Sequence, residues 1–280
     1  MRVASSRRGI SAMRPRHARI APFAAVAVAV VVATAAAAAR ATGGPTAVGA
    51  DGPAAVGALF TLTGDGSLGN HFCTATVVDS PSGDVVVTAA HCLVGRTIGA
   101  FAFVPGYSDG RAPFGIWTVE QEFVDRPWET SANSDDDFAF LVVGRDGGQG
   151  NLQALTAGER LGSDPVAGKR ATVVGYPAAA DAPVTCTNSL LPFGPGELEF
   201  DCDGYTNGTS GSALVVDSDP VTHLGTVVGV IGGYELGGLT PSVSYAAAFR
   251  RATAALFREC VDATWPTSTD LPLARPLPHD

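Results

Sequence analysis

Charge is scarce in this sequence, and positive charge is the scarcest. Only 16% of the 280 residues are charged, and Lys169 is the single lysine. Seven of the 18 basic residues and none of the 27 acids lie in residues 1–41, so residues 42–280 carry 11 basic residues against 27 acids. An acidic body of this kind repels phosphate backbones and anionic membrane surfaces. The sequence therefore predicts no nucleic-acid partner, no stable membrane association and a soluble monomer.

The sequence also lacks the cysteine and histidine patterns of a structural metal site. None of its five cysteines forms a C-x-x-C pair, and no group of histidines accompanies them. Zinc sites are typically built from such groups. We therefore expect neither a metal nor another cofactor. Two disulfides and one free thiol, with the pairing left open, are the simplest arrangement of Cys73, Cys92, Cys186, Cys202 and Cys260.

The N-terminal residues have the pattern of a secretory signal peptide. Three arginines within residues 14–19 precede the uncharged residues 21–39, and the following Ala-Arg-Ala fits an A-x-A cleavage signal. The uncharged run could just span a bilayer as an anchor, but alanine is weakly apolar and no stop-transfer charges follow. We predict that residues 1–41 are a signal peptide, that the protein is secreted to the extracellular space, and that residues 42–53 are a short propeptide or a linker.

From residue 54 onward, short apolar runs alternate with turn-forming residues. Many short strands without βα alternation favour an all-β sandwich or barrel. A single apolar stripe predicts one helix over residues 245–260, and the proline-rich residues 263–280 are typical of an extended tail. The predicted strands cover residues 56–60, 72–78, 85–88, 138–143, 171–174, 212–216 and 226–231.

Three stretches carry residues suited to covalent catalysis. His91 follows one apolar run, Asp137 directly precedes another, and Ser210 lies among small residues that open a third. A serine hydroxyl needs a base to take its proton, and the base needs a carboxylate to hold its tautomer. A developing oxyanion needs preorganised donors, which the backbone N–H groups of Gly208 and Ser210 would supply. The order His, Asp, Ser therefore suggests a nucleophilic triad.

These stretches resemble the trypsin-like (chymotrypsin-fold) serine peptidases, and in particular their secreted bacterial branch. The matching motifs are Thr-Ala-Ala-His-Cys at 88–92, Asp-Phe-Ala-Phe-Leu at 137–141 and Gly-Thr-Ser-Gly-Ser at 208–212. Over residues 54–262, the resemblance implies an all-β fold of two antiparallel six-stranded barrels with a cleft between them and a C-terminal helix. It implies that His91 is the general base and acid, Asp137 its orienting carboxylate and Ser210 the nucleophile. The protein would then hydrolyse peptide or protein substrates as a serine endopeptidase, through an acyl-enzyme.

The assignment of the carboxylate depends on register. Asp137 is chosen because the Asp-aromatic-Ala-aromatic-Leu pattern begins with it. Asp135 and Asp136 are the alternatives, and otherwise we expect them to be solvated loop acids. Ser212 also lies nearby, but the Gly-x-Ser-Gly pattern centres on Ser210.

The resemblance also bears on the cysteines and on activation. It implies a Cys73–Cys92 disulfide beside the histidine, a Cys186–Cys202 disulfide before the serine loop, and Cys260 as a buried, inert thiol. In trypsin itself an aspartate precedes the nucleophile and pairs with a newly freed N-terminal amine, whereas Thr209 stands at that position here. We therefore expect activity that does not require such an amine.

The substrate-binding residues are the least determined part of the sequence. By resemblance, the floor of the specificity pocket falls on Gly204, six residues before Ser210, and carries no charge unless the register shifts to Asp203. Residues Ile231, Gly232 and Gly233 would pair with the substrate backbone. This strand lacks the histidine that glutamyl-specific members carry there. The sequence leaves the cleavage preference open.

Two other functional classes fit parts of the sequence. An α/β-hydrolase would also show Gly-x-Ser near a strand, but its triad runs Ser, acid, His, and the βα alternation is missing. A catalytically silent member of the same family would act as a protein-binding module, and only the bulky Tyr234 near the expected cleft favours it. Since fold alone does not fix activity, this second alternative stays open.

Overall fold

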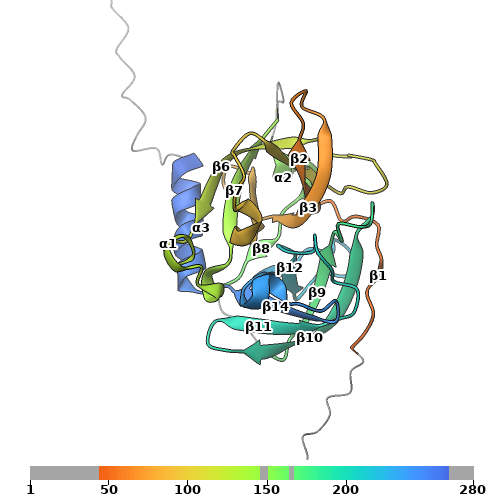
Figure 1. Ribbon diagram of the computed structural model, residues 1–280, viewed down its shortest axis with the longest axis vertical. Coiled ribbons are helices and arrows are strands. Elements are labelled where there is room, and N and C mark those ends of the chain that lie inside the picture. The colour runs from red at the N-terminus through yellow and green to blue at the C-terminus, as the bar shows by residue number, and fades with distance from the viewer. Residues whose placement is uncertain (1–43, 146–150, 164–166, 265–280) are drawn as a thin grey trace, which may run out of the picture. The chain divides into compact units, whose positions relative to one another are not determined.

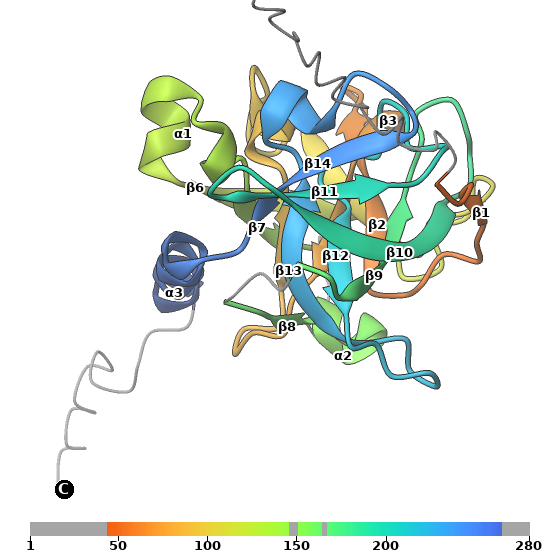
Figure 2. The ribbon, with the colours of Figure 1, turned by 90° about the horizontal axis from the view of Figure 1, so that it is seen from below.

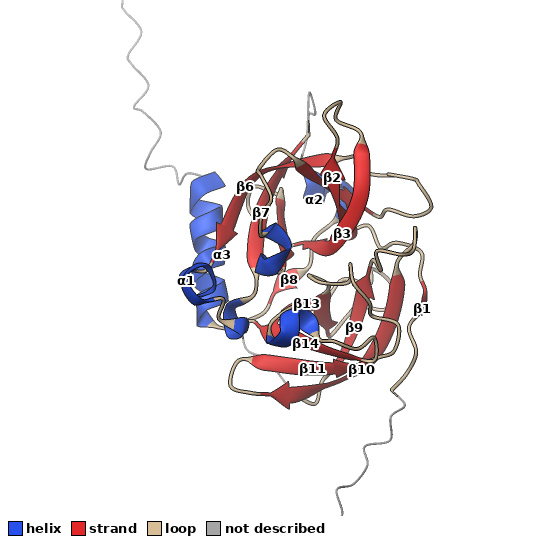
Figure 3. Ribbon diagram, in the orientation of Figure 1, coloured by secondary structure: helices blue, strands red, loops and turns tan. Residues whose placement is uncertain are grey.

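The computed structural model describes residues 44–145, 151–163 and 167–264, and within them strands predominate. The predicted signal peptide and residues 265–280 of the predicted tail lie outside the described residues. Most of the strands form two antiparallel barrels, one built from each half of the described chain (Figures 1 and 3). No helix of the described residues is long and apolar enough to cross a membrane.

The first barrel closes in the order β2-β3-β4-β7-β6-β5. Every neighbouring pair is antiparallel, and β2 pairs with both β3 and β5 to close the ring. Its strands are β2 (Val56–Leu62), β3 (Leu68–Val77), β4 (Val85–Thr88), β5 (Phe101–Pro105), β6 (Trp117–Val124) and β7 (Ala139–Gly144).

The second barrel follows the order β9-β10-β11-β14-β13-β12, and the β12–β9 pairing closes it. Two short strands join its sheet from outside: β1 (Val48–Gly49) pairs with β10, and β8 (Arg160–Leu161) lies parallel to β13. The six barrel strands are β9 (Arg170–Gly175), β10 (Val184–Phe193), β11 (Glu197–Asp201), β12 (Ala213–Val216), β13 (Thr226–Ile231) and β14 (Val243–Ala248). Two antiparallel six-stranded barrels confirm the predicted architecture and exclude the α/β-hydrolase alternative.

The unbroken apolar runs of the sequence are strands that are buried on both faces. In β7, Leu141 and Val143 point into the core of the first barrel, while Phe140 and Val142 join a second cluster between the barrels. In β12, Val215 joins that same cluster, while its neighbours face the core of the second barrel. Alternate side chains of a strand point to opposite faces. These runs therefore fill three apolar layers and fix the two barrels against each other.

The C-terminal helix begins later than the sequence pattern predicts. Residues 245–248, inside the predicted helix, belong to β14, and the helix α3 is Arg251–Thr264. The small apolar residues of β14 pair with both β11 and β13, so barrel closure outweighs their helical periodicity. Helix α3 lies beside β6 and β7 (Figures 1 and 2), and the ring of Phe257 packs at a tilt against that of Phe140, with the ring centroids 5.2 Å apart. The remaining helices are short: α1 (Arg126–Ser131), α2 (Leu152–Thr156) and the 3₁₀ turns η1 (Ala90–Leu93), η2 (Ser134–Asp136) and η3 (Tyr234–Gly237).

The cysteines pair as the resemblance implies. Cys73 in β3 is bonded to Cys92 in η1, and Cys186 in β10 is bonded to Cys202 after β11. Cys260 is a buried free thiol in α3, and burial raises its pKa to about 12. A buried thiol with a raised pKa carries little of the reactive thiolate, which agrees with the expectation of an unreactive Cys260.

The residues between the predicted signal peptide and the first barrel are part of the second barrel's sheet. The Ala47 N–H donates to the Asp203 carbonyl (2.7 Å), and the Asp203 N–H donates to the Pro45 carbonyl (2.9 Å). Strand β1 continues this contact, with Val48 opposite Thr185. Of residues 42–53, which the sequence leaves as a propeptide or a linker, the described part thus contacts Asp203, ahead of the serine loop, and adds the edge strand β1 to β10.

Candidate active site

His91 and Asp137 meet at one end of a strand pair. Strands β4 and β7 are antiparallel, with Thr88 at the end of β4 opposite Ala139 at the start of β7. His91, three residues after β4, therefore lies beside Asp137, two residues before β7. The Nδ1 of His91 lies 2.7 Å from Oδ2 of Asp137, and the His91 backbone N–H donates to Oδ1 (2.8 Å). The Asp137 side chain is fully buried and that of His91 is 13% exposed. With Nδ1–H bound to the carboxylate, Nε2 is free to accept a proton.

Two glycines bring the second barrel onto Asp137. The Gly233 N–H donates to Oδ2 of Asp137 (2.9 Å), which gives this buried carboxylate three donors. A Cβ on Gly232 would lie 2.9 Å from the same oxygen, so only glycine permits this approach. Gly233 has a φ of +79°, a conformation that glycine adopts without strain.

The predicted substrate-pairing strand is therefore largely occupied by the protein itself. The Ile231 N–H and C=O bond to Ser212 and Gly211, and the Gly233 C=O accepts from the Leu236 N–H (2.9 Å). The Gly232 N–H donates to Tyr245, while its carbonyl accepts no hydrogen bond from the described residues. Strand β13 ends at Ile231 and the chain turns into η3. This leaves the Gly232 carbonyl as the group of these three residues that a substrate N–H could use.

Ser210 lies in a tight loop that contacts the segment carrying His91. The Ser210 carbonyl accepts from the Thr74 N–H (2.8 Å), across the junction of the barrels. The following Gly211 packs so closely that a Cβ there would lie 3.1 Å from the Ala89 nitrogen. Cys73, beside Thr74, is bonded to Cys92, beside His91. The loop and the histidine are thus tied to the same end of the first barrel.

The peptide groups of this loop leave two donors unused. The Ala178 N–H donates to the Asn207 carbonyl (2.7 Å), which turns the N–H of Gly208 the other way. The Ser212 N–H donates to the Thr209 carbonyl (3.1 Å), which does the same for the N–H of Ser210. Among the described residues, neither of these two N–H groups has an acceptor. Two unpaired backbone N–H groups on one loop are the kind of donor that an oxyanion hole uses.

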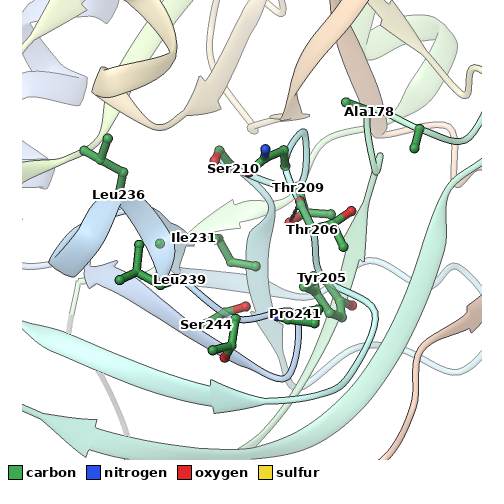
Figure 4. Close-up of a pocket in the computed structure, with 15 residues that line it drawn as sticks. Ala178, Tyr205, Thr206, Thr209, Ser210, Ile231, Leu236, Leu239, Pro241 and Ser244 are labelled. Carbon is green, nitrogen blue, oxygen red and sulfur yellow. Dashed lines mark hydrogen bonds between the residues drawn. The ribbon is translucent and has the colours of Figure 1, made fainter.

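A cavity of about 560 Å³ opens beside Ser210 (Figure 4). Figure 4 shows Ser210 at one end of it and Tyr205, Pro241 and Ser244 at the other. Ser244 is 2% exposed, and the Tyr205 hydroxyl donates a hydrogen bond to the Val173 carbonyl (2.7 Å). None of the described residues that line this cavity is charged: Ala178, Ala179, Tyr205, Thr206, Asn207, Thr209, Ser210, Ile231, Leu236, Gly237, Gly238, Leu239, Thr240, Pro241 and Ser244.

Of the predicted pocket residues, only Ile231 lines this cavity, which we call the Ser210 pocket. Gly204 is not among the lining residues, and a Cβ added to it would lie 3.3 Å from the Ala47 side chain. Its neighbour Tyr205 forms part of the wall instead. The loop from Leu236 to Pro241 and the buried Ser244 gave no signal in the sequence, because no motif marks them and they follow Ser210 by more than 25 residues.

The two acids that precede Asp137 are not the solvated loop residues that the sequence suggests. Asp136 is 6% exposed, accepts from the Asn133 amide and lies 3.5 Å from the Arg250 guanidinium. Burial raises its pKa. Asp135 lies 3.7 Å from the same guanidinium, and its carbonyl also accepts from Arg250 (3.0 Å). In the structure the hydrogen-bond partner of His91 is Asp137.

A group of Cys73, Cys92 and the His91 ring has its ligand atoms within 4.8 Å of one another. Both sulfurs belong to the disulfide and cannot serve as thiolate ligands. The group therefore does not fit a metal ion.

Two barrels with a His–Asp pair and a serine loop at their junction define the chymotrypsin-like class. Residues 73–230, more than half of the chain, match the family of trypsin-like peptidase domains, and the chain belongs to that family. No curated protein matches it by sequence.

Solved structures of the same fold are distant in sequence. The protease Anisep from Arthrobacter nicotinovorans is 23% identical with a TM-score of 0.64, over 76% of this chain and 98% of its own. The thermostable serine protease AL20 from an extremophilic microorganism is 24% identical with a TM-score of 0.62, over 75% and 97%. A Glu endopeptidase is 15% identical with a TM-score of 0.60, over 78% and 98%. The two-barrel fold of this chain thus matches nearly the full length of each of these three proteins.

Proposed function

We propose that this chain is a secreted serine endopeptidase that hydrolyses peptide bonds in peptide or protein substrates. The observation that carries the proposal is the fully buried Asp137, which accepts both the ring and the backbone N–H of His91. Such a carboxylate fixes the imidazole tautomer that a serine nucleophile requires. The free N–H groups of Gly208 and Ser210 lie on the loop of that serine.

In acylation, Nε2 of His91 takes the proton of Ser210 Oγ while Oγ bonds to the substrate carbonyl carbon. The carbonyl oxygen becomes an oxyanion that accepts from the N–H groups of Gly208 and Ser210. The C–N bond then breaks, and His91 gives its proton to the leaving amine. Asp137 stabilises the transient imidazolium and stays ionised throughout.

In deacylation, the same groups act on water. His91 takes a proton from a water molecule, whose oxygen bonds to the acyl carbon of the ester on Ser210. The tetrahedral intermediate again places its oxyanion toward Gly208 and Ser210, and Ser210 leaves with the proton held by His91. The triad and water balance every bond and proton, so the proposed cycle calls for no metal or organic cofactor.

The lining of the Ser210 pocket supports an endopeptidase that prefers uncharged side chains. No charged group among its described residues could bind a terminal amine, a terminal carboxylate, or a basic or acidic side chain. Leu236 and Leu239, which are 56% and 79% exposed, give the pocket an apolar rim. Desolvating an unpaired charge in such a site is costly.

We expect peptide-library cleavage to favour leucine, phenylalanine or tyrosine before the scissile bond. The kcat/KM for these residues should exceed that for Arg, Lys, Asp or Glu by about 100-fold, since leaving a charge unpaired costs about 3 kcal/mol. Ser244→Asp should cut the apolar preference and favour Arg or Lys, whereas Ser244→Asn, of similar size, should not. A wild-type preference for a charged residue would contradict this assignment of the pocket.

The proposed nucleophile is tested by intact-mass analysis after treatment with a fluorophosphonate. The wild-type protein should gain a single adduct on Ser210, and Ser210→Ala and His91→Ala should gain none. Ser212→Ala, which removes a fully buried hydroxyl two residues away, should keep the adduct. An adduct that survives Ser210→Ala would assign the nucleophile elsewhere. The same spectra report the mature N-terminus and so test removal of residues 1–41.

The catalytically silent binding module is the competing proposal. Its sequence support was Tyr234, but this ring packs against Phe193 and Tyr245, with centroids 5.3 and 5.2 Å away, and does not line the Ser210 pocket. A folded protein that gains no fluorophosphonate adduct would favour the module.

Export is supported by the two disulfides, which persist in oxidising compartments.

A further inference from the structure

Thr74, in β3 of the first barrel, uses all of its polar groups to hold the Ser210 loop and its surroundings. Its N–H donates to the Ser210 carbonyl (2.8 Å), and its Oγ1–H donates to the Gly208 carbonyl (3.0 Å). Its Oγ1 accepts from the Tyr176 N–H (2.9 Å), and its own carbonyl accepts from the Thr88 hydroxyl (2.8 Å). The side chain is fully buried. One residue thus joins both barrels at the loop.

The two contacts of the Thr74 hydroxyl bear on the orientation of one particular donor. The carbonyl groups on both sides of the Gly208 N–H are held by hydrogen bonds. The Asn207 carbonyl accepts from the Ala178 N–H, and the Gly208 carbonyl accepts from the Thr74 hydroxyl. The Tyr176 segment that supplies Ala178 is itself held by Thr74. Gly208 has a φ of +98°, and a glycine can rotate its peptides at little steric cost. Without these bonds, the N–H could turn away from the oxyanion position.

Within the serine loop, no charged group provides this restraint. The residue before the nucleophile is Thr209, whose hydroxyl donates to the Thr206 carbonyl (2.8 Å) in the same loop. The first residues that the structure describes hydrogen-bond to Asp203 and pair with Thr185 instead. Within the described chain, the hydrogen bonds that hold the serine loop thus come from uncharged groups.

We propose that Thr74 is a positioning residue whose hydroxyl preforms the oxyanion hole from the opposite barrel. The hydroxyl holds the Gly208 peptide groups in two ways: directly, by its bond to the Gly208 carbonyl, and indirectly, through the Tyr176–Ala178 segment. The inference rests on the proposed hydrolysis through Ser210. It makes the hole ready as soon as the two barrels have docked. A processed N-terminus is then not needed to form it.

The test compares Thr74→Val with Thr74→Ser, using fluorophosphonate titration to count active sites. Valine keeps the shape and removes the hydroxyl, so the Gly208 N–H should be displaced from the oxyanion position. We expect the kcat per titrated site to fall by about 10- to 100-fold, with KM changed less than about twofold, because an oxyanion donor acts mainly on the transition state. Binding of a peptide aldehyde, which forms a tetrahedral oxyanion on Ser210, should weaken by the same factor. Thr74→Ser should restore both within about threefold.

The matched control is Thr76→Val in the same strand. Thr76 is also fully buried, but its hydroxyl has no hydrogen-bond partner among the described residues, so its loss should leave kcat unchanged. If Thr74→Val unfolds more easily yet keeps its kcat per site, Thr74 is merely structural and the proposal fails. An equal loss of kcat in Thr76→Val would also overturn it. Failure of the wild-type protein to take the fluorophosphonate would instead refute the proposed function.

Discussion

Asp137→Asn should lower kcat by about 10,000-fold without unfolding the protein, the loss expected when a triad histidine is held in the wrong tautomer. Oδ2 of Asp137 accepts from the His91 ring and from the Gly233 N–H, and Oδ1 accepts from the His91 backbone. An asparagine offers one acceptor oxygen and one NH₂ in place of two acceptors. If the NH₂ faces the ring, Nδ1 becomes the acceptor and Nε2 carries the proton. His91 then cannot take the proton of Ser210.

The measurement is kcat per titrated site, with thermal unfolding to show that Asp137→Asn is folded. Asp136→Asn is the matched control, because Asp136 is buried and adjacent but bonds to Asn133 and Arg250 rather than to His91. It should change kcat by no more than a few-fold. If Asp136→Asn loses activity as severely and Asp137→Asn does not, the orienting carboxylate is Asp136.

The parts of the fold that could be predicted are those in which the sequence pattern fits only one type of secondary structure. The runs that contain Phe140 and Val215 are apolar without interruption, because both faces of each strand are buried between two cores. Strands with exposed polar positions, such as β6 and β10, gave no such signal. The start of α3 was misplaced because residues 245–248 fit a helical stripe equally well until barrel closure selects the strand.

The candidate site divides in the same way. His91, Asp137 and Ser210 could be proposed from the sequence because the chemistry expected of each restricts it to a few residue types in a fixed local setting. Thr74 gave no signal, because the role proposed for it depends on contacts with residues more than 100 positions away in sequence. The walls of the Ser210 pocket were mostly missed for a related reason: they come from several segments, consist mainly of glycine, alanine, threonine and leucine, and are recognisable only by the shape they form together.

Gly211→Ala should destabilise the protein by about 3 kcal/mol or more, an effect that requires a specific steric cause. Gly211 has a φ of +82°, which costs an L-residue about 1–2 kcal/mol. A Cβ at this position would also lie 2.2 Å from the Thr74 carbonyl oxygen and 2.2 Å from the Thr88 hydroxyl oxygen. These atoms belong to the first barrel, so the Ser210 loop would have to move away from it.

Gly99→Ala separates the two contributions. Gly99 has the same φ of +82°, but a Cβ there meets no atom of the other described residues within 4 Å, so only the backbone cost should appear. Urea unfolding should therefore show a loss of about 1–2 kcal/mol for Gly99→Ala, and a clearly larger one for Gly211→Ala. Fluorophosphonate labelling per folded molecule should stay normal in Gly99→Ala and slow sharply in Gly211→Ala, since the displaced loop carries Ser210. Equal stability of the two variants would mean that the loop can move away from the first barrel at little cost, despite the close contacts around Gly211.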